Sequence, residues 1–289
     1  MEPNKRIRSI IKLALYDDMG RGDVTTKTLI KDNRIKRAHI IAREKGVLCG
    51  SNMVRAIFKL VDESVVIKMR KRDGDKLKVD DRVCTIRGPI HSILKAERVV
   101  LNYVSYLSGI STMTNKYVQK IKGTHAKIYD TRKTTPGYRL LEKYAVITGG
   151  GYNQRIGLHD QVLIKDNHYQ ALGKRKLRGV ASLIRNVRNK IPRGMKIQVE
   201  VDSLALLQHI LPARPDMILL DNMRPRMLKR AIKIVRAENE RTERHMKIEA
   251  SGGITLQNVR QIARLGVDRI SVGAITHSAH NLDFSLEVV

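Results

Sequence analysis

The feature that most constrains the fold is a regular alternation of strand-like and helical segments that begins near Lys127. Among the helical segments, one begins near Pro225, a favourable first-turn residue, and another spans Thr255–Leu265 and is followed by Gly266. Repeats of strand and helix with short connections produce parallel strands, so the sequence predicts an α/β barrel or an open parallel sheet. The expected strands are Ala126–Tyr129, Gln161–Ile164, Lys196–Val201, Met217–Leu220, Met246–Glu249 and Arg269–Val272.

The first 120 or so residues have a different pattern, typical of a small mixed α/β unit. Strand-like runs at Arg37–Ala42, Val65–Met69 and Arg82–Arg87 are separated by glycine-containing turn signals. A long helical stretch follows from about Ser92 to Ile121, with Gly109 as a candidate break. The chain of 289 residues therefore has room for about two domains, and its pattern predicts two.

The composition is strongly basic, with 56 Lys and Arg against 28 Asp and Glu and a formal net charge of +28. This charge favours anionic partners, while the 42% hydrophobic content excludes wholesale disorder. The aromatic content of 4% argues against proteins that stack nucleic-acid bases on aromatic side chains. Cys49 and Cys84 form no CxxC pair, which favours a reducing, cytoplasmic location. The sequence has no apolar run long enough for a membrane helix, so no membrane association is expected.

Charged residues follow the predicted strands at the point where each strand ends. The charged clusters include Asp130–Lys133, Lys165–His168, Glu200, Asp221 and Glu249. Loops often begin with polar residues, and this explains a single strand end but poorly explains five in succession. Functional groups of α/β barrels lie at the carboxyl ends of the strands, so we expect one functional site there.

Glycine-rich segments follow the last two predicted strands. Small residues at such positions allow backbone N–H groups to approach an anion, and this predicts a phosphate site. The residues concerned are Ser251, Gly252, Gly253 and Gly273. Glu200 and Asp221 end neighbouring strands, where they could hold Mg²⁺, bind sugar hydroxyls, or act as a general acid and base.

Several cations are expected near the same strand ends. Arginine matches a carboxylate with two parallel hydrogen bonds, so a convergence of such side chains predicts a substrate with several negative groups. The candidates are Arg98, Arg132, Lys133, Arg155 and Lys165. The histidines show no zinc-ligand spacing, and neither a nucleophile elbow nor a P-loop motif occurs.

Long strings in the chain match a known family. They include GDVTT (22–26), ERVVLNYVSYLSGIST (97–112), DTRKTTPGYRLLEKYAV (130–146), GGGYNQRIGLHDQVLIKDNH (149–168), VEVD (199–202), ILLDNM (218–223), IEASGGI (248–254) and GVDRISVGAITHS (266–278). In these strings, which follow the family's order through nearly the whole chain, the sequence resembles quinolinate phosphoribosyltransferase, or nicotinate-nucleotide pyrophosphorylase (carboxylating).

The resemblance implies a type II phosphoribosyltransferase fold of class α/β. An N-terminal α/β sandwich domain is expected over residues 1–115, with residues 280–289 returning to it. An incomplete TIM-like α/β barrel is expected over residues 116–279. The resemblance also implies a homodimer, with higher oligomers left open, in which Arg98 acts in the neighbouring subunit's site.

The resemblance further implies the reaction and the role of each residue. Quinolinate and phosphoribosyl pyrophosphate (PRPP) would give nicotinate mononucleotide, pyrophosphate and CO₂ on the route to NAD. The catalytic set would be Lys133, Lys165, Glu200 and Asp221, with Glu200 and Asp221 binding ribose hydroxyls and Mg²⁺ through PRPP and water. Quinolinate would be bound by Arg98, Arg132, Arg155 and Lys165, and the 5′-phosphate by the backbone of Ser251, Gly252, Gly253 and Gly273.

One residue departs from the family's pattern, and two alternatives remain open. Gln154 stands where the family usually has a histidine that helps to bind the acid substrate. The amide of Gln154 can still donate a hydrogen bond but carries no charge, so we expect a modified acid pocket. A related phosphoribosyltransferase with another acid acceptor is the first alternative. A basic barrel that binds nucleic acid is the second, less favoured one, supported by nine Lys and Arg without an acid in residues 171–196.

Overall fold

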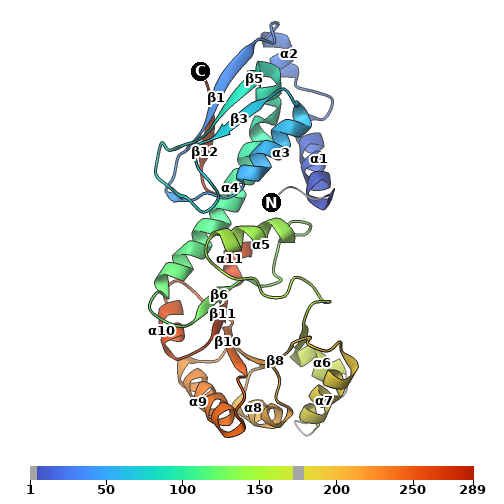
Figure 1. Cartoon of the computed structure of the whole chain (residues 1–289), viewed down its shortest axis with the longest axis vertical. Coiled ribbons are helices and arrows are strands. Elements are labelled where there is room, and N and C mark those ends of the chain that lie inside the picture. The colour runs from blue at the N-terminus through green and yellow to red at the C-terminus, as the bar shows by residue number, and fades with distance from the viewer. Residues whose placement is uncertain (1–4, 172–178) are drawn as a thin grey trace. The chain divides into compact units, whose positions relative to one another are not determined.

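The structure is a computed structural model that describes residues 5–171 and 179–289, and these form two compact units (Figure 1). Among the described residues, no helix is long and apolar enough to cross a membrane. The domain boundaries expected from the sequence stay a prediction, and the structure additionally assigns residues 134–150 and 275–279 to unit 1. Unit 1 comprises the described residues of Met1–Asn115, Thr134–Gly150 and Ile275–Val289, and unit 2 comprises those of Lys116–Lys133 and Gly151–Ala274.

Unit 1 is built on an antiparallel sheet with the strand order β12-β1-β5-β3. Its C-terminal strand β12 pairs with β1 so that Val288 lies opposite Ala38. A two-stranded sheet, β2-β4, accompanies it. The elements are α1 (Lys5–Met19), α2 (Val24–Leu29), β1 (Ile35–Ala42), β2 (Gly46–Val47), α3 (Ser51–Val61), β3 (Val66–Met69), β4 (Lys76–Leu77), β5 (Arg82–Pro89), α4 (Ile90–Lys120), α5 (Arg139–Thr148), α11 (Ala274–His277) and β12 (Phe284–Val288).

Helix α4 runs without interruption through Gly109, so the break considered there does not occur. A Cβ atom at Gly109 would lie 2.2 Å from the carbonyl oxygen of His280. The glycine therefore serves a close approach between α4 and the C-terminal segment rather than a helix end.

Unit 2 is built on a parallel sheet with the strand order β6-β11-β10-β9-β8-β7. The strands β6 and β7 form its two edges, as expected for an incomplete barrel, so the predicted fold class and six strands are confirmed. The elements are β6 (Lys127–Tyr129), β7 (Val162–Ile164), α6 (Asp166–Ala171), α7 (Val180–Lys190), β8 (Ile197–Val201), α8 (Leu204–Ile210), the 3₁₀ turn η1 (Leu211–Ala213), β9 (Met217–Asp221), α9 (Pro225–Thr242), β10 (Lys247–Ser251), α10 (Val259–Arg264) and β11 (Arg269–Ser271).

The core of unit 2 is apolar except for a few side chains on the strands. Helix α9 buries Leu228, Ala231 and Val235 on one face, as its sequence period predicts. On the strands, Gln198 and Glu249 are fully buried. Buried polar groups are costly unless they are hydrogen-bonded, so these two residues require partners inside the sheet.

The segment after unit 1's α5 returns alongside β6. The N–H of Tyr152 donates to the carbonyl of Ile128 at 2.8 Å, and the N–H of Asp130 donates to the carbonyl of Tyr152 at 3.0 Å. This parallel bridge brings Gln154 and Arg155 to the end of β6. We call the side of the sheet where the strands end its carboxyl end, and the opposite side its amino end.

Candidate active site

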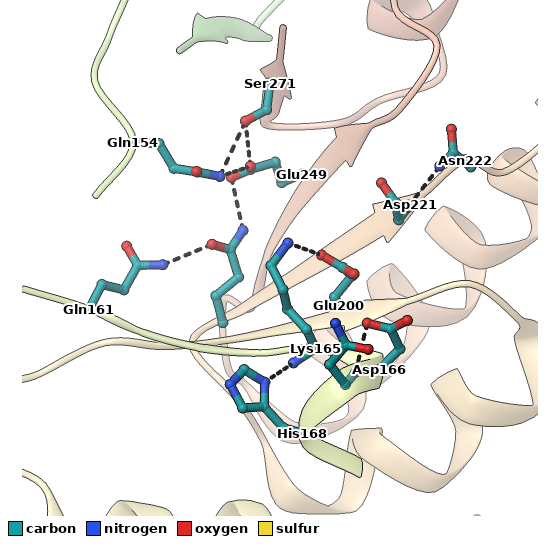
Figure 2. Close-up of polar contacts among 12 residues, drawn as sticks. Gln154, Gln161, Lys165, Asp166, His168, Glu200, Asp221, Asn222, Glu249 and Ser271 are labelled. Atoms are coloured by element: carbon teal, nitrogen blue, oxygen red, sulfur yellow. Dashed lines mark hydrogen bonds and ion pairs between the residues drawn. The ribbon is translucent and has the colours of Figure 1, made fainter. Parts of the chain in front are cut away.

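An ion pair joins two neighbouring strands at the carboxyl end. Lys165 directly follows β7 and Glu200 lies near the end of β8, and the Nζ atom of Lys165 is 3.0 Å from Oε2 of Glu200 (Figure 2). The Nδ1 atom of His168 accepts a hydrogen bond from the backbone N–H of Lys165 at 2.9 Å, which orders the start of α6. The Lys165 side chain is 42% exposed, so the pair is weak and an anionic ligand can approach the ammonium group.

A second carboxylate ends the next strand. Asp221 is the last residue of β9, and its Oδ2 atom accepts a hydrogen bond from the side chain of Asn222 at 2.9 Å. Glu200 and Asp221 therefore stand on paired parallel strands. In the described part of the chain, no group of three or more His, Cys, Asp or Glu could hold a metal ion alone. Two carboxylates fit Mg²⁺, which commonly binds one or two carboxylates together with substrate phosphates and water.

The glycine loop after β10 has a backbone that only glycine tolerates well. Gly252 and Gly253 have φ values of +85° and +59°. A Cβ atom at Gly252 would lie 2.1 Å from Oδ1 of Asn222, whose N–H donates to the carbonyl of Ser251 at 2.9 Å. The helix expected from Thr255 begins only at Val259, so that expectation was wrong, and a turn separates the loop from α10. The predicted phosphate contact therefore depends on the loop's own backbone.

Two arginines lie close together near the end of β6. Arg155 is buried and donates through Nη1 to the carbonyl of Gln161 at 3.3 Å. Its Nε atom is buried without a hydrogen-bond partner in the part of the chain that the structure describes. Burial lowers the pKa of Arg155, the positive charge of Arg132 lowers it further, and Asp160 opposes both effects. A bound anion would relieve this repulsion, and Lys133 follows Arg132 directly.

A buried polar network crosses the inside of the sheet, and Gln154 belongs to it. Gln154 donates through Nε2 to Oε1 of Glu249 at 2.7 Å, and Gln198 donates to Oε2 of Glu249 at 3.0 Å. Gln161 donates to Oε1 of Gln198 at 2.8 Å (Figure 2). The Nε atom of Arg269 lies 2.9 Å from Oε2 of Glu249. The contact of Gln154 with the acid substrate stays a prediction, because in this structure its side-chain amide is hydrogen-bonded to Glu249.

The position of Glu249 differs from the one expected. The sequence places Glu249 at a strand end, but it lies in the middle of β10 and is fully buried. Ser271 also donates to it. Gln161, Gln198, Arg269 and Ser271 were not singled out from the sequence, although polar residues at every second position of apolar strands could have indicated them.

The predicted site residues divide between the two units. Arg98 lies exposed on α4 in unit 1. All other predicted residues belong to unit 2, at or beyond strand ends, and their roles stay predictions. They are Arg132, Lys133, Gln154, Arg155, Lys165, Glu200, Asp221, Ser251, Gly252, Gly253 and Gly273.

Cations, paired carboxylates and a glycine loop at the carboxyl end of a parallel sheet are typical of enzymes that bind phosphorylated substrates. Residues 110–287 match the quinolinate phosphoribosyl transferase C-terminal domain, and residues 23–108 match the N-terminal domain. The chain therefore belongs to the quinolinate phosphoribosyltransferase family.

Curated relatives and solved structures agree with this assignment. The chain is 37% identical over 283 residues to the probable nicotinate-nucleotide pyrophosphorylase (carboxylating) of Bacillus subtilis, covering 98% of this chain and 93% of the relative. It is 40% identical over 275 residues to the protein of the same name from Synechocystis, covering 95% and 90%. The solved nicotinate-nucleotide pyrophosphorylase of Francisella tularensis has a TM-score of 0.90 at 35% identity, covering 100% of this chain and 98% of that one.

Proposed function

We propose that this chain transfers the phosphoribosyl group of PRPP to quinolinate with loss of CO₂, giving nicotinate mononucleotide and pyrophosphate for NAD biosynthesis. Relatives of 37–40% identity over nearly the whole chain carry the name of this activity. The single structural observation that carries the proposal is Arg155, buried beside Arg132, because the Nε atom of Arg155 has no hydrogen-bond partner among the described residues and an anionic ligand would stabilise it. Quinolinate has two carboxylates and supplies such a ligand.

The chemistry requires alignment and charge stabilisation more than it requires a base. The pyridine nitrogen attacks the anomeric carbon of PRPP, a C–N bond forms, and the C–O bond to pyrophosphate breaks. The resulting pyridinium accepts the electron pair left when the C–C bond to the adjacent carboxylate breaks, and a proton from water replaces CO₂. Lys133 and Lys165 stabilise the charge of the leaving pyrophosphate, while Glu200 and Asp221 hold the ribose hydroxyls.

Mg²⁺ is the cofactor of this proposal. Glu200 and Asp221 would hold it through the substrate's phosphates and water, where it would neutralise charge on the pyrophosphate. The fit is supported by two carboxylates on paired strands, one of which already balances Lys165.

A homodimer in which Arg98 completes the partner's acid site is a further part of the proposal. Arg98 is exposed on α4, so its guanidinium is available to a second subunit. Mixing Arg98→Ala with Lys165→Ala, each inactive alone, should restore about a quarter of the wild-type rate, because each hybrid dimer then has one intact site. No recovery after verified subunit exchange would contradict this arrangement.

The decisive experiment is turnover with quinolinate and, separately, with nicotinate, following CO₂, pyrophosphate and the mononucleotide. We expect equal amounts of all three products from quinolinate and none from nicotinate. Product from another acid, without CO₂, would favour the related transferase with a different acceptor. Gln154→His belongs in the same assay, and unchanged KM and kcat would exclude Gln154 from the acid pocket.

A reducing, cytoplasmic compartment completes the proposal. Cys49 and Cys84 are both free and buried, and burial raises the pKa of each thiol to about 12. Thiols with so high a pKa stay protonated and unreactive. Neither cysteine is in a disulfide, which is the bond that would require an oxidising compartment.

A further inference from the structure

A large cavity lies at the amino end of the unit 2 sheet, opposite the candidate active site. Its volume is about 830 Å³. Residues at the start of five parallel strands line it: Gln161 before β7, Lys196 before β8, Asp216 before β9, Lys247 at the start of β10 and Arg269 at the start of β11. Helix α7 adds Arg185 and Arg188. The lining residues all belong to unit 2.

The lining of this amino-end cavity is strongly cationic. It contains seven Lys or Arg side chains and His245, but only one carboxylate, that of Asp216. Asp216 lies 2.5 Å from Arg188 and 3.3 Å from Lys196, so it is already shared by two cations. Arg269 is balanced by Glu249. The cavity is therefore left with an excess of positive charge.

Four exposed cations carry most of this excess, namely Arg185, Arg214, Arg244 and Lys247. Arg185 lines the cavity from α7, whereas Arg244 and Lys247 line it from the segment that leads into β10, and none of these three forms an ion pair with a carboxylate of the described residues. Like charges gathered in a hollow repel each other, and an anion bound among them removes that repulsion. Arginine in particular matches phosphate oxygens with paired donors.

The size of the cavity restricts the ligand. A volume of about 830 Å³ is in the range of pockets that hold cofactor-sized molecules. Double-stranded nucleic acid is bound by cations spread along a stripe or face, whereas here they surround a hollow. Residues Arg185, Arg188 and Lys196 also come from the basic segment 171–196, whose charge the transfer reaction does not use; residues 172–178 of that segment lie outside the described residues.

We propose that the amino-end cavity is a binding site for a small polyphosphate, such as the triphosphate chain of a nucleotide or free tripolyphosphate, separate from the active site. The site is formed by residues that take no part in the proposed reaction. The proposal of a polyphosphate site therefore does not depend on the proposed transfer reaction.

The test is calorimetric titration of the full chain with tripolyphosphate, ATP and adenosine at physiological salt. We expect tripolyphosphate and ATP to bind and adenosine not to bind, which assigns affinity to the phosphates. The cavity variant Arg185→Gln/Arg244→Gln/Lys247→Gln should weaken tripolyphosphate binding about tenfold or more. Its KM for PRPP and its kcat should equal those of the wild type, which also shows that it is folded.

A charge-matched control separates the cavity from the net charge. Lys229→Gln/Arg230→Gln/Lys233→Gln removes three exposed cations of α9 that do not line the cavity. We expect this control to change tripolyphosphate affinity by less than about twofold. Equal weakening in both triple variants would overturn the proposal.

The active site also binds phosphates, so competition with PRPP completes the design. Saturating PRPP should leave the cavity titration intact. If PRPP displaces all tripolyphosphate, or if the cavity variant binds it as the wild type does, the proposal is wrong. It is also wrong if duplex DNA binds more tightly than tripolyphosphate and the cavity variant weakens that binding, because the ligand is then a nucleic acid.

Discussion

The two ends of the unit 2 sheet use charge in different ways. At the carboxyl end, cations and carboxylates alternate, as in the Lys165–Glu200 pair beside Asp221. At the amino end, seven Lys and Arg side chains surround a single carboxylate, Asp216. A mixed arrangement orients a substrate that has both hydroxyls and anionic groups, whereas a uniform one attracts charge alone. The two ends of the sheet therefore present different patterns of charge to a ligand.

The polar network between the two ends is expected to show the largest effect on stability. Glu249→Ala leaves the Arg269 guanidinium buried without its partner, and this should lower the free energy of unfolding by about 3–5 kcal/mol. Urea denaturation measures the loss. The control Glu238→Ala removes a pair with the exposed Arg241 and should change the urea midpoint far less. Similar losses in both variants would mean that the network does not stabilise unit 2.

At the carboxyl end, Lys165→Met should have the largest effect on activity. We expect kcat/KM for PRPP to fall about 10²–10³-fold, because the ammonium group no longer stabilises the leaving pyrophosphate. The control Lys229→Met changes an exposed lysine of α9 and should leave steady-state kinetics unchanged. A decrease of less than about twofold in Lys165→Met would remove this residue from the catalytic set.

The comparison also shows which end could be predicted from sequence. The strands of unit 2 and the charged residues at their ends follow from local periodicity, which places Lys165 and Glu200 on neighbouring strands. Glu249 was misplaced, because a shift of two residues in the end of β10 moves it from the loop into the core.

Features that depend on distant segments could not be predicted in the same way. Gly109 allows a contact with His280, which lies 171 residues further along the chain. The sequence around Gly109 therefore does not distinguish this role from that of a helix break. The amino-end cavity combines α7 with residues at the start of five strands. The basic character of residues 171–196 is evident from the sequence. The sequence does not indicate that Arg244 and Lys247 line the same cavity as the cations of that segment.

The glycine loop provides a matched comparison within the carboxyl end. In Gly252→Ala the new Cβ would meet Asn222 at 2.1 Å in addition to the unfavourable positive φ, so we expect a loss of about 2 kcal/mol in stability and a higher KM for PRPP. Gly253→Ala has a positive φ but no atom within 4 Å, and should cost about 1 kcal/mol. Urea denaturation and PRPP kinetics measure both. Equal effects would show that the contact with Asn222 has no influence.

The smallest expected effect is at the amino end, in Asp216→Asn. Burial raises the pKa of Asp216, but the N–H of Ile197 and the side chains of Arg188 and Lys196 outweigh burial and leave this pKa below its ordinary value. A folded-state pKa below the unfolded value of about 3.9 means that the carboxylate stabilises the protein above that pH. This stabilisation disappears as the pH falls through the folded-state pKa. We expect Asp216→Asn to lower the free energy of unfolding by about 1 kcal/mol at pH 7, because partial exposure of the side chain weakens its ion pairs.

Urea midpoints of the wild type and Asp216→Asn from pH 3 to 7 test this sign. The difference should be largest near pH 7 and shrink toward pH 3, and a difference independent of pH would contradict the assigned pKa direction.

The same variant also tests the difference in charge between the two ends of the sheet. Removing the only carboxylate of the amino-end cavity should strengthen tripolyphosphate binding while leaving the KM for PRPP unchanged, because the two anion sites are on opposite ends of the strands.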